Sequence, residues 1–559
     1  MNLPWAPHYD PDVPLEAAVA ADAVPSLLIR AAEHAPQTPA LVFFGRYVTY
    51  QELEDQTARL AQAFQNLGLA PGRRLAILLP NCPQLVMAYH AALRLGAVVV
   101  FLNPLLSPKE LAFQIANSGA GHLVVLDHLL PKVQVAEKRG ELTQVIITRL
   151  SDYLPLHLKC LYPLKARRQG LALGFKPGPG RRSWREVLKS PPLPRSGLPH
   201  WEDLAVLQYT GGTTGVPKAA MLTHGNLMAN VAQINAWLPR ARYRAERVMG
   251  LLPFCHAFGL TACLNWPMSQ AAMIVTLPRF ELEMFLKAMK KHRPTVLPGV
   301  PTLFVALINE PRLAGLDLSA LWLCVSGSAP LPQEVRDRFE SLSKCRILEG
   351  YGLTEASPVT HFNPIQGRRP PGSMGMPMPG TRAQVMDQET GRRELPPGGV
   401  GELVLQGPQV MQGYWQNPEE TAIALRDGWL YTGDLARMDE SGYFYIVERK
   451  KDMVISGGYN IYPREVEEVL YQHPGVKEAV AFGMPDAYRG EVVKVVIVPQ
   501  DGRPPEVEDI LEHCRRELAL YKVPKLVEFR SELPKSLVGK VLRRLLREES
   551  FKAGAPSEV

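Results

Sequence analysis

The chain has 559 residues, of which 46% are hydrophobic and 21% charged, and its formal net charge is +7. This length is too great for one hydrophobic core, so we expect two or more globular domains. No uninterrupted apolar stretch reaches the about 18 residues of a transmembrane helix. The first residues lack the layout of a signal peptide, so the expected compartment is the cytoplasm. The seven cysteines form no CxxC pair, which argues against a disulfide framework or a zinc site.

The positive charge is concentrated in one leucine-rich segment. Residues 153–185 carry eight Lys or Arg and no Asp or Glu, so the rest of the chain is close to neutral. Such a segment can attach to an anionic membrane surface, and the alternative is a solvated loop. No nucleic-acid-binding motif accompanies the charge, so a nucleic-acid partner is not expected.

The first 200 residues alternate between helical and extended patterns. Residues 48–68 open with a capping box, Thr49 and Glu52, carry apolar side chains at helical spacing and stop at Gly68. A strand, a helix and a second strand are predicted next, over residues 73–80, 85–96 and 97–103. This order predicts an α/β fold of mainly parallel sheets flanked by helices.

The pattern changes in the last third of the chain. From about Gly372 to Val447 short apolar runs alternate with Gly/Pro turns, which predicts a small antiparallel β region. After the motif ERKKDM, residues 448–453, strand and helix patterns alternate to the end of the sequence. The tail therefore suits an independent α+β domain.

A glycine- and threonine-rich loop, YTGGTTGVPK, follows the buried strand predicted at 204–209. It contains three threonines, three glycines and a lysine: Thr210, Thr213, Thr214, Gly211, Gly212, Gly215 and Lys218. Glycines allow backbone conformations that turn amides toward an anion, and the lysine adds a mobile charge. The lysine does not directly follow the last glycine, so this is not a Walker A loop. The alternative to a phosphate-binding loop at this position is an ordinary turn.

The run YTGGTTGVPKAAMLTH resembles the signature of the adenylate-forming superfamily, which includes acyl-CoA synthetases, luciferases and peptide-synthetase adenylation domains. Ala219 stands where members usually have glycine. Further motifs follow in the family's order: LPFCHAFG, VSGSAPL, EGYGLTE, YTGDLA, ERKKDM, SGGYNIYPREVE and LPKSLVGKVLRR. The resemblance covers about the full length, and segments such as GPQVMQGYWQNPE are most similar to bacterial long-chain fatty acyl-CoA synthetases.

The resemblance implies a nucleotide site. The residues implied to flank or contact adenine are Gly327, Ser328, Ala329, Pro330, Glu349, Gly350, Tyr351 and Gly352, with Tyr351 stacking on the base. Thr354 would contact the α-phosphate, Lys218 would meet the β- and γ-phosphates, and Glu355 would hold Mg²⁺ together with Thr210. The ribose would be held by Asp434 and Arg449. His256 would gate the acyl pocket, and the alternative for it is a satisfied core histidine.

The resemblance also implies a moving domain. Residues 1–448 would form the domain that binds AMP and the acyl group, 449–452 a hinge, and 453–559 a small mobile C-terminal domain. Lys451 would be the pivot, and Gly457 and Gly458 would border the pantetheine arm. Lys540, in the helical pattern GKVLRR, would stabilise the charge of the adenylation transition state.

The implied reaction is ATP-dependent activation of long-chain fatty acids to acyl-CoA through an acyl-adenylate, with Mg²⁺ and with coenzyme A as co-substrate. The expected partners are fatty acid, ATP and coenzyme A; membrane contact through 153–185 and a homodimer are held open. Open alternatives are a medium-chain, aryl or other acid, a luciferase-like oxygenase, and a non-catalytic nucleotide-binding regulator. The regulator would be expected to lack Lys540 or Glu355. A peptide-synthetase domain is disfavoured because no carrier domain follows Val559.

Overall fold

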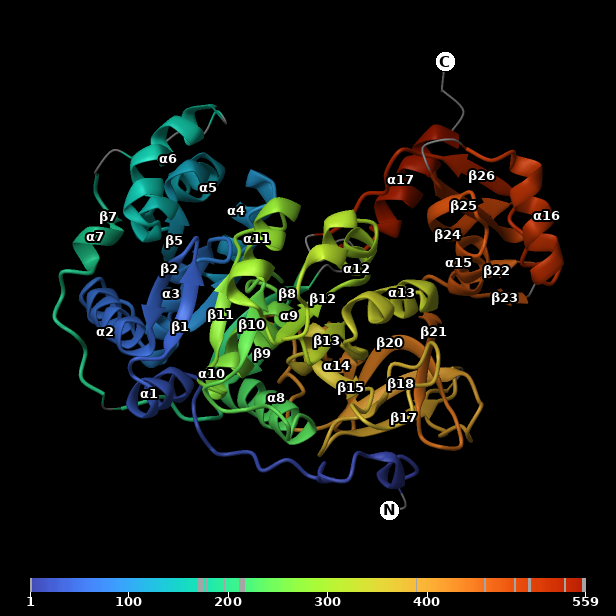
Figure 1. Ribbon diagram of the computed structural model, residues 1–559, viewed down its shortest axis with the longest axis horizontal. Helices are drawn as coiled ribbons and strands as arrows, with labels where there is room; N and C mark the ends of the chain where they lie inside the picture. The colour runs from blue at the N-terminus through green and yellow to red at the C-terminus, as the bar shows by residue number, and fades with distance from the viewer. Residues whose placement is uncertain are drawn as a thin grey trace.

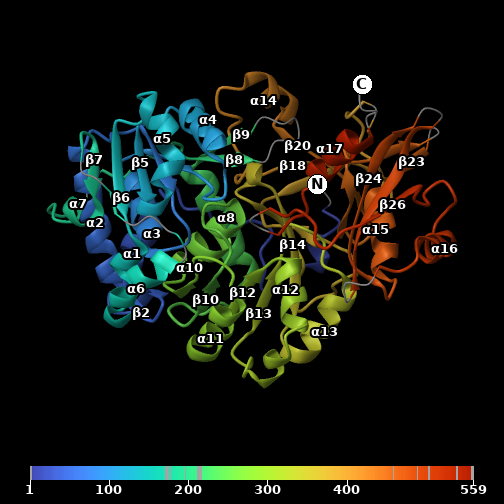
Figure 2. The same ribbon diagram turned by 90° about the horizontal axis from the view of Figure 1, so that it is seen from above.

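The computed structural model describes residues 3–168, 170, 174–175, 178–195, 197–210, 217–388, 390–456, 459–486, 489–500, 504–536 and 539–554. A large body extends from the N-terminus and carries a smaller part, coloured red, at one end (Figure 1). The view from above shows the same arrangement (Figure 2). We call the smaller part the C-terminal unit; its described elements lie between residues 454 and 554.

The first sheet of the large body is parallel except at one edge. Its strands are, in order across the sheet, β7 (Arg181–Ser183), β6 (Gln144–Thr148), β5 (His122–Leu126), β3 (Arg74–Leu78), β4 (Val98–Phe101), β8 (Leu204–Thr210) and β9 (Lys218–Thr223). Strands β8 and β9 pair antiparallel, with Thr210 opposite Lys218. This pairing places the two ends of the glycine-rich loop side by side.

The second sheet has a parallel centre and antiparallel edges. Its strands are, in order, β16 (Met376–Pro377), β15 (Val359–Phe362), β14 (Ile347–Gly352), β13 (Leu323–Ser326), β12 (Val296–Gly299), β10 (Arg247–Gly250), β11 (Met273–Thr276), β1 (Pro39–Phe43) and β2 (Arg46–Thr49). Strands β13 and β14 pair in parallel, so the motifs that follow them emerge at the same edge of the sheet.

Helices cover both sheets and separate them. Those of the large body are α1 (Pro25–His34), α2 (Tyr50–Asn66), α3 (Pro83–Arg94), α4 (Pro108–Ser118), α5 (Leu130–Lys138), α6 (Leu156–Arg168), α7 (Trp184–Val187), α8 (His224–Trp237), α9 (Ala257–Leu260), α10 (Trp266–Ser269), α11 (Leu282–His292), α12 (Pro301–Ile308), α13 (Gln333–Ser343) and α14 (Pro418–Ala424). Every residue of α3 is buried. Met87 of α3 shares one hydrophobic cluster with Ile77 of β3 and Ile274 of β11, so one core joins both sheets. The predicted α/β fold is confirmed.

An antiparallel sheet follows the two parallel ones. Its strands are β17 (Arg382–Met386), β18 (Gly401–Gln406), β20 (Trp429–Met438), β19 (Leu425–Arg426) and β21 (Phe444–Arg449). The prediction of a small antiparallel region is confirmed. Strand β21 ends at the motif that leads into the C-terminal unit.

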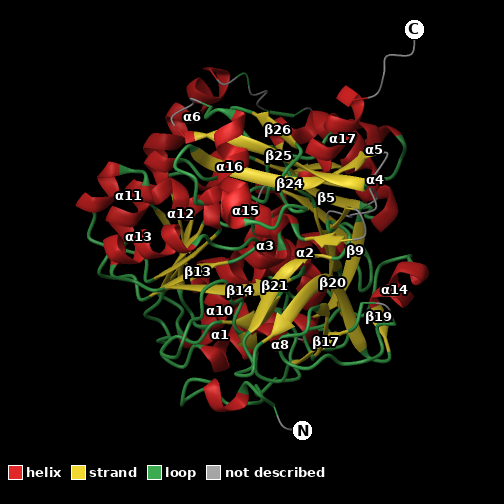
Figure 3. Ribbon diagram, turned by 90° about the vertical axis from the view of Figure 1, so that its right-hand side faces the viewer, coloured by secondary structure: helices red, strands yellow, loops and turns green. Residues whose placement is uncertain are grey.

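The C-terminal unit has a sheet and a core of its own. Its elements are β22 (Val454–Ser456), β23 (Tyr459–Ile461), α15 (Pro463–Tyr471), β24 (Val476–Asp486), β25 (Gly490–Pro499), α16 (Val507–Glu517), β26 (Leu526–Phe529) and α17 (Arg543–Gly554). Val466 of α15, Val495 of β25 and Ile510 of α16 belong to one hydrophobic cluster. Figure 3 shows β24, β25 and β26 grouped apart from β17, β20 and β21, as expected for an α+β domain.

Local details differ from the sequence-based expectations. Thr49 accepts from the amide of Glu52, but the Glu52 carboxylate accepts from Arg46, so the capping box is only half formed. Lys540 lies in a turn before α17, not within a helix. The basic segment 153–185 is no simple loop, because it contains α6, β7, α7 and the buried Trp184. Among the helices that the structure describes, none has the length and apolar character to cross a membrane.

Candidate active site

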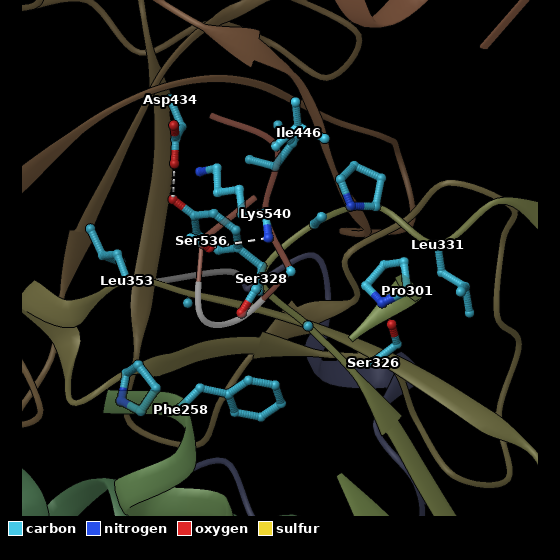
Figure 4. Close-up of a pocket in the computed structure, with 18 of the residues that line it drawn as sticks. Phe258, Pro301, Ser326, Ser328, Leu331, Leu353, Asp434, Ile446, Ser536 and Lys540 are labelled. Carbon is cyan, nitrogen blue, oxygen red and sulfur yellow. Dashed lines mark hydrogen bonds between the residues drawn. The ribbon is translucent and has the colours of Figure 1, made fainter. Parts of the chain in front are cut away.

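A cavity of about 2490 Å³ lies where the parallel sheets, the antiparallel sheet and the C-terminal unit meet. A single small-molecule site occupies about 300–1,000 Å³, so this cavity has room for several ligand groups together. It is lined by Thr210 and Lys218 of the first sheet, Asp434 of the antiparallel sheet and Lys540 of the C-terminal unit. The close-up in Figure 4 shows Asp434, Ser328 and Lys540 around this space.

The glycine-rich loop begins and ends at the cavity wall. Thr210 ends β8 and donates its hydroxyl to the carbonyl of Lys218, with 3.3 Å between the oxygens. The loop residues predicted to bind phosphate between them lie outside the described residues: Gly211, Gly212, Thr213, Thr214 and Gly215. The Lys218 ammonium is 2.5 Å from the Glu420 carboxylate of α14 and 5.4 Å from the ring centre of Tyr414. The lysine is therefore already oriented by an anion and an aromatic face.

The predicted metal residue Glu355 lies in a short 3-10 turn, Thr354–Ala356, beside the cavity. Its Oε1 accepts the hydroxyl of Tyr414 at 2.8 Å. Thr354 and Thr210 line the same cavity, so carboxylate and hydroxyl oxygens are present there. Mg²⁺ prefers oxygen ligands, keeps several waters and takes the rest from substrate phosphates, so this donor set fits it. Within the described part of the chain, no three His, Cys, Asp or Glu side chains group as a metal cluster.

The predicted ribose and adenine residues are directly bonded to each other. Asp434 on β20 lies opposite Arg449 at the end of β21, and its Oδ1 is 3.5 Å from the guanidinium. The Tyr351 hydroxyl donates to Asp434 Oδ2 at 2.6 Å, the dashed bond in Figure 4. Burial, reinforced by the Asp434 charge, raises the pKa of Tyr351 well above its ordinary value. Tyr351 therefore stays a neutral donor that holds the carboxylate in place.

The turns after β13 and within β14 need small residues. Ser328 has φ of 70°, in the left-handed region. A Cβ at Gly350 would lie 2.5 Å from the Phe362 ring, and one at Gly352 would lie 2.2 Å from the Pro358 carbonyl. The remaining predicted residues of these turns, Gly327, Ala329 and Pro330, also line the cavity. The backbone is therefore packed closely against its neighbours at these positions.

Glu349 links the two turns. Its Oε2 accepts the amide of Leu331 at 3.1 Å, and burial raises the pKa of its carboxyl group. The side chain thus fixes one predicted motif against the other, and it also borders the cavity.

His256 combines a structural contact with a place on the cavity wall. Its Nδ1 accepts the amide of Phe258 at 3.3 Å, which caps the N-terminus of α9. Burial, followed by the nearby charge of Lys540, lowers the pKa of His256 to about 4, so the ring is neutral at pH 7. The role of a gate to the acyl pocket stays a prediction.

Lys540 brings a cation from the C-terminal unit into the cavity. Burial lowers the pKa of its ammonium to about 8; Arg449 and Arg543 also lower it, while Asp434 and Asp452 raise it. Its backbone amide donates to Ser536 Oγ at 3.1 Å, as Figure 4 shows.

Of the three other residues predicted at or near the hinge, the structure describes Lys451 but not Gly457 or Gly458. Lys451 lines the same cavity, and burial lowers the pKa of its ammonium. Gly457 and Gly458 lie outside the described residues.

Sequence reasoning missed Glu420 and Tyr414, which hold Lys218 and Glu355. Tyr414 belongs to GPQVMQGYWQNPE, a segment similar to long-chain synthetases but given no role, and Glu420 directly follows that segment. It also missed the apolar wall, which includes Ile234, Trp237, Ala262, Trp266, Val296 and Val305. These side chains come from separate elements, so only the fold brings them together.

Comparison with known proteins agrees with this architecture. The AMP-binding enzyme family matches residues 28–415, and the AMP-binding enzyme C-terminal domain matches residues 465–540. The chain therefore belongs to the AMP-binding enzyme family, the adenylate-forming superfamily that its motifs indicated.

The similar proteins include acid–CoA ligases. A long-chain-fatty-acid–CoA ligase of Bacillus subtilis is 44% identical over 549 residues, 98% of either chain. Another from Escherichia coli O6:H1 is 40% identical over 569 residues, 98% of this chain and 99% of that one. The ATP-bound crystal structure of MatB from Rhodopseudomonas palustris is 31% identical with a TM-score of 0.83, covering 95% of this chain and 100% of that one.

Proposed function

We propose that this protein converts a long-chain fatty acid, ATP and coenzyme A into acyl-CoA, AMP and pyrophosphate through an acyl-adenylate. The observation that carries the proposal is the convergence of Lys218, Asp434 and Lys540 on one cavity with an apolar wall. The full-length similarity to long-chain-fatty-acid–CoA ligases supports the choice of acid. The enzyme is an AMP-forming acid–thiol ligase.

In the first half-reaction the fatty carboxylate attacks the α-phosphate of ATP, and pyrophosphate leaves. Both reactants are anions, so the site must align them and neutralise charge. Lys218 would meet the leaving phosphates, and Lys540 would lie between the carboxylate and the α-phosphate. Asp434 and Arg449 would hold the ribose. Mg²⁺, held through Glu355 and Thr210, would supply further neutralisation of phosphate charge.

In the second half-reaction the thiol of coenzyme A attacks the acyl carbonyl and AMP leaves. We propose that residues 453–559 rotate as a domain about a hinge at 449–452, with Lys451 as pivot and 1–448 as the fixed domain. The rotation would withdraw Lys540 and bring Gly457 and Gly458 to the site. One cavity would then serve both steps.

The test is pyrophosphate release with ATP, Mg²⁺ and a ladder of acids, with and without coenzyme A. We expect the highest kcat/KM with long unbranched fatty acids, and acyl-CoA only when coenzyme A is present. Medium-chain and aryl acids are the competing substrates, and the same ladder ranks them. A preference for an aryl or short acid would overturn the assignment of substrate, while no acid-dependent release at all would overturn the activity.

We also propose that α6 rests on an anionic membrane surface. Leu156, Leu161 and Leu164 are 78%, 58% and 64% exposed, although a leucine is ordinarily buried. Arg167 and Arg168 are exposed on the same helix, and no acidic residue occurs from 153 to 185. Exposed leucines beside exposed arginines match an interface of lipid tails and anionic headgroups.

The position of α6 is compatible with domain rotation. It lies at the end of the molecule away from the C-terminal unit in both Figure 1 and Figure 2. A membrane under α6 would therefore leave the C-terminal unit free, and a long-chain substrate could enter from the lipid. Homodimerisation stays a prediction without a surface assigned to it.

A further inference from the structure

Arg543, the first residue of α17, joins the C-terminal unit to the antiparallel sheet. Its Nη2 is 2.7 and 2.8 Å from the two carboxylate oxygens of Glu467 on α15. Its Nη1 is 2.9 Å from Oε1 of Glu448 on β21 and 3.5 Å from Oδ2 of Asp452. The guanidinium thus contacts two carboxylates within the motif ERKKDM, Glu448 and Asp452, and one beyond it, Glu467.

The Glu448 carboxylate is the β21 end of this contact, and it also bonds Arg464 of the C-terminal unit. Its side chain is only 5% exposed. Oε1 also accepts the amide of Arg449, and Oε2 accepts the amide of Arg464, both at 2.9 Å. A buried carboxylate whose two oxygens both accept hydrogen bonds has a defined position. The guanidinium of Arg543, which is hydrogen-bonded to it, is therefore strongly oriented.

The contact matters because Lys540 lies three residues before Arg543. Within the described residues, no carboxylate lies within ion-pair distance of the Lys540 ammonium, so no ion pair there fixes the position of its side chain. Its backbone is held instead, by bonds between Lys540 and Ser536 in the turn that leads into α17. The location of the ammonium therefore depends on where the start of α17 is anchored.

We propose that Arg543 is a positioning residue whose bond to Glu448 holds the C-terminal unit in the orientation that places Lys540 in the cavity. This proposal rests on the proposed function and deepens it. Glu448 precedes the proposed hinge and Arg543 follows it, so rotation for the second half-reaction breaks their bond. The bond to Glu467 lies within the C-terminal unit and moves with it.

The test compares Glu448→Gln with Glu467→Gln, because each removes one carboxylate charge from the same guanidinium. Adenylation is followed as fatty-acid-dependent ATP–pyrophosphate exchange, and thioester formation is followed from pre-made acyl-adenylate and coenzyme A. We expect Glu448→Gln to slow adenylation about tenfold, the scale of a typical coupling between distant parts of a protein. Thioester formation should be unchanged or faster. Glu467→Gln should change both half-reactions by the same factor.

Equal loss of both half-reactions in Glu448→Gln, or no loss in either, would overturn the proposal. Thermal unfolding checks that each variant is folded. If Glu448→Gln is unfolded, Arg543→Lys is tested in its place, because lysine keeps the positive charge but lacks the paired donors of the guanidinium. Selective slowing of adenylation in that variant would support the proposal, and equal slowing of both half-reactions would overturn it. Failure of the wild-type enzyme to activate any fatty acid would instead sink the proposed function, so the two failures are distinguishable.

Discussion

Lys540 shows how one buried side chain acquires a working pKa. A lysine ammonium loses water when it enters a cavity, and this disfavours its charged form. The positive charges of Arg449 and Arg543 act in the same direction, while Asp434 and Asp452 act against it, and the pKa falls to about 8. The residue is therefore charged at neutral pH and loses its proton within the range of an ordinary activity assay.

The pH profile of adenylation follows from this shift. Because the lowered pKa is about 8, the charged fraction is nearly complete at pH 7 and falls about tenfold per pH unit well above pH 8. We expect kcat/KM for adenylation, which reports the free enzyme, to fall in the same way. The measurement is acid-dependent pyrophosphate release from pH 6.5 to 9.5.

The control is Lys540→Arg, whose guanidinium stays protonated throughout. If that variant keeps activity and its alkaline limb disappears, Lys540 is the titrating group. An identical limb in both proteins would assign the titration to another residue.

The structure of helix α6 locates the proposed membrane-facing surface more narrowly than the count of basic residues in 153–185 does. Leu158 and Tyr162 face the main core, and Ala166 is buried, while the leucines of the opposite face are exposed. Other basic residues of the segment are ion-paired: Arg181 with Glu137 and Arg185 with Asp152. The membrane-facing property is therefore assigned to α6 rather than to the whole of 153–185. Deleting that whole segment would also remove the buried Trp184 from the core.

The element-level prediction uses the triple substitution of Leu156, Leu161 and Leu164 by Gln. We expect binding to vesicles that contain phosphatidylglycerol to weaken at least about tenfold, because each leucine loses apolar transfer energy of up to about 1.5–3 kcal/mol. Cosedimentation measures the binding, and stability should change by no more than about 0.5 kcal/mol per site. The matched control is Leu520→Gln, since Leu520 is 75% exposed but lies in the C-terminal unit. Equal binding by the triple variant and the wild type would contradict the membrane proposal.

At the scale of the whole molecule, the site exists only where separately folded parts meet. The residues proposed to contact the nucleotide line the cavity from the large body, while Lys540, the cation proposed for the α-phosphate, lines it from the C-terminal unit. Because Lys540 belongs to a unit with its own hydrophobic core, the proposed rotation would supply this cation for one step and remove it for the next.

This division predicts unequal effects on the two half-reactions. Lys540→Ala should lower adenylation by about 10²–10³-fold, the scale of losing one group that stabilises transition-state charge. Thioester formation from pre-made acyl-adenylate should stay within a few-fold of wild type, because Lys540 would be withdrawn at that stage. Separate single-turnover assays measure the two rates. A comparable loss in both would remove the assigned role from Lys540.

Most of the fold was predictable because periodicity and turn residues report local burial. The strands at 73–80 and 97–103 and the helix between them appear as β3, β4 and α3, and the antiparallel region appears where Gly/Pro turns interrupt short apolar runs. The sequence-based prediction was wrong where a side chain could form a hydrogen bond with more than one partner. Glu52 bonds to Arg46 instead of completing its capping box, because Arg46 on β2 offers a charged donor.

The sequence by itself determined the α/β class, the order of the motifs and the chemical types of the candidate site residues, because these depend on local pattern and composition. Only the tertiary structure decided the partners: Lys218 with Glu420, Tyr351 with Asp434, and Arg543 with Glu448. The members of each pair are far apart in the chain. Their contact depends on how the sheets and the C-terminal unit pack, which no local pattern encodes.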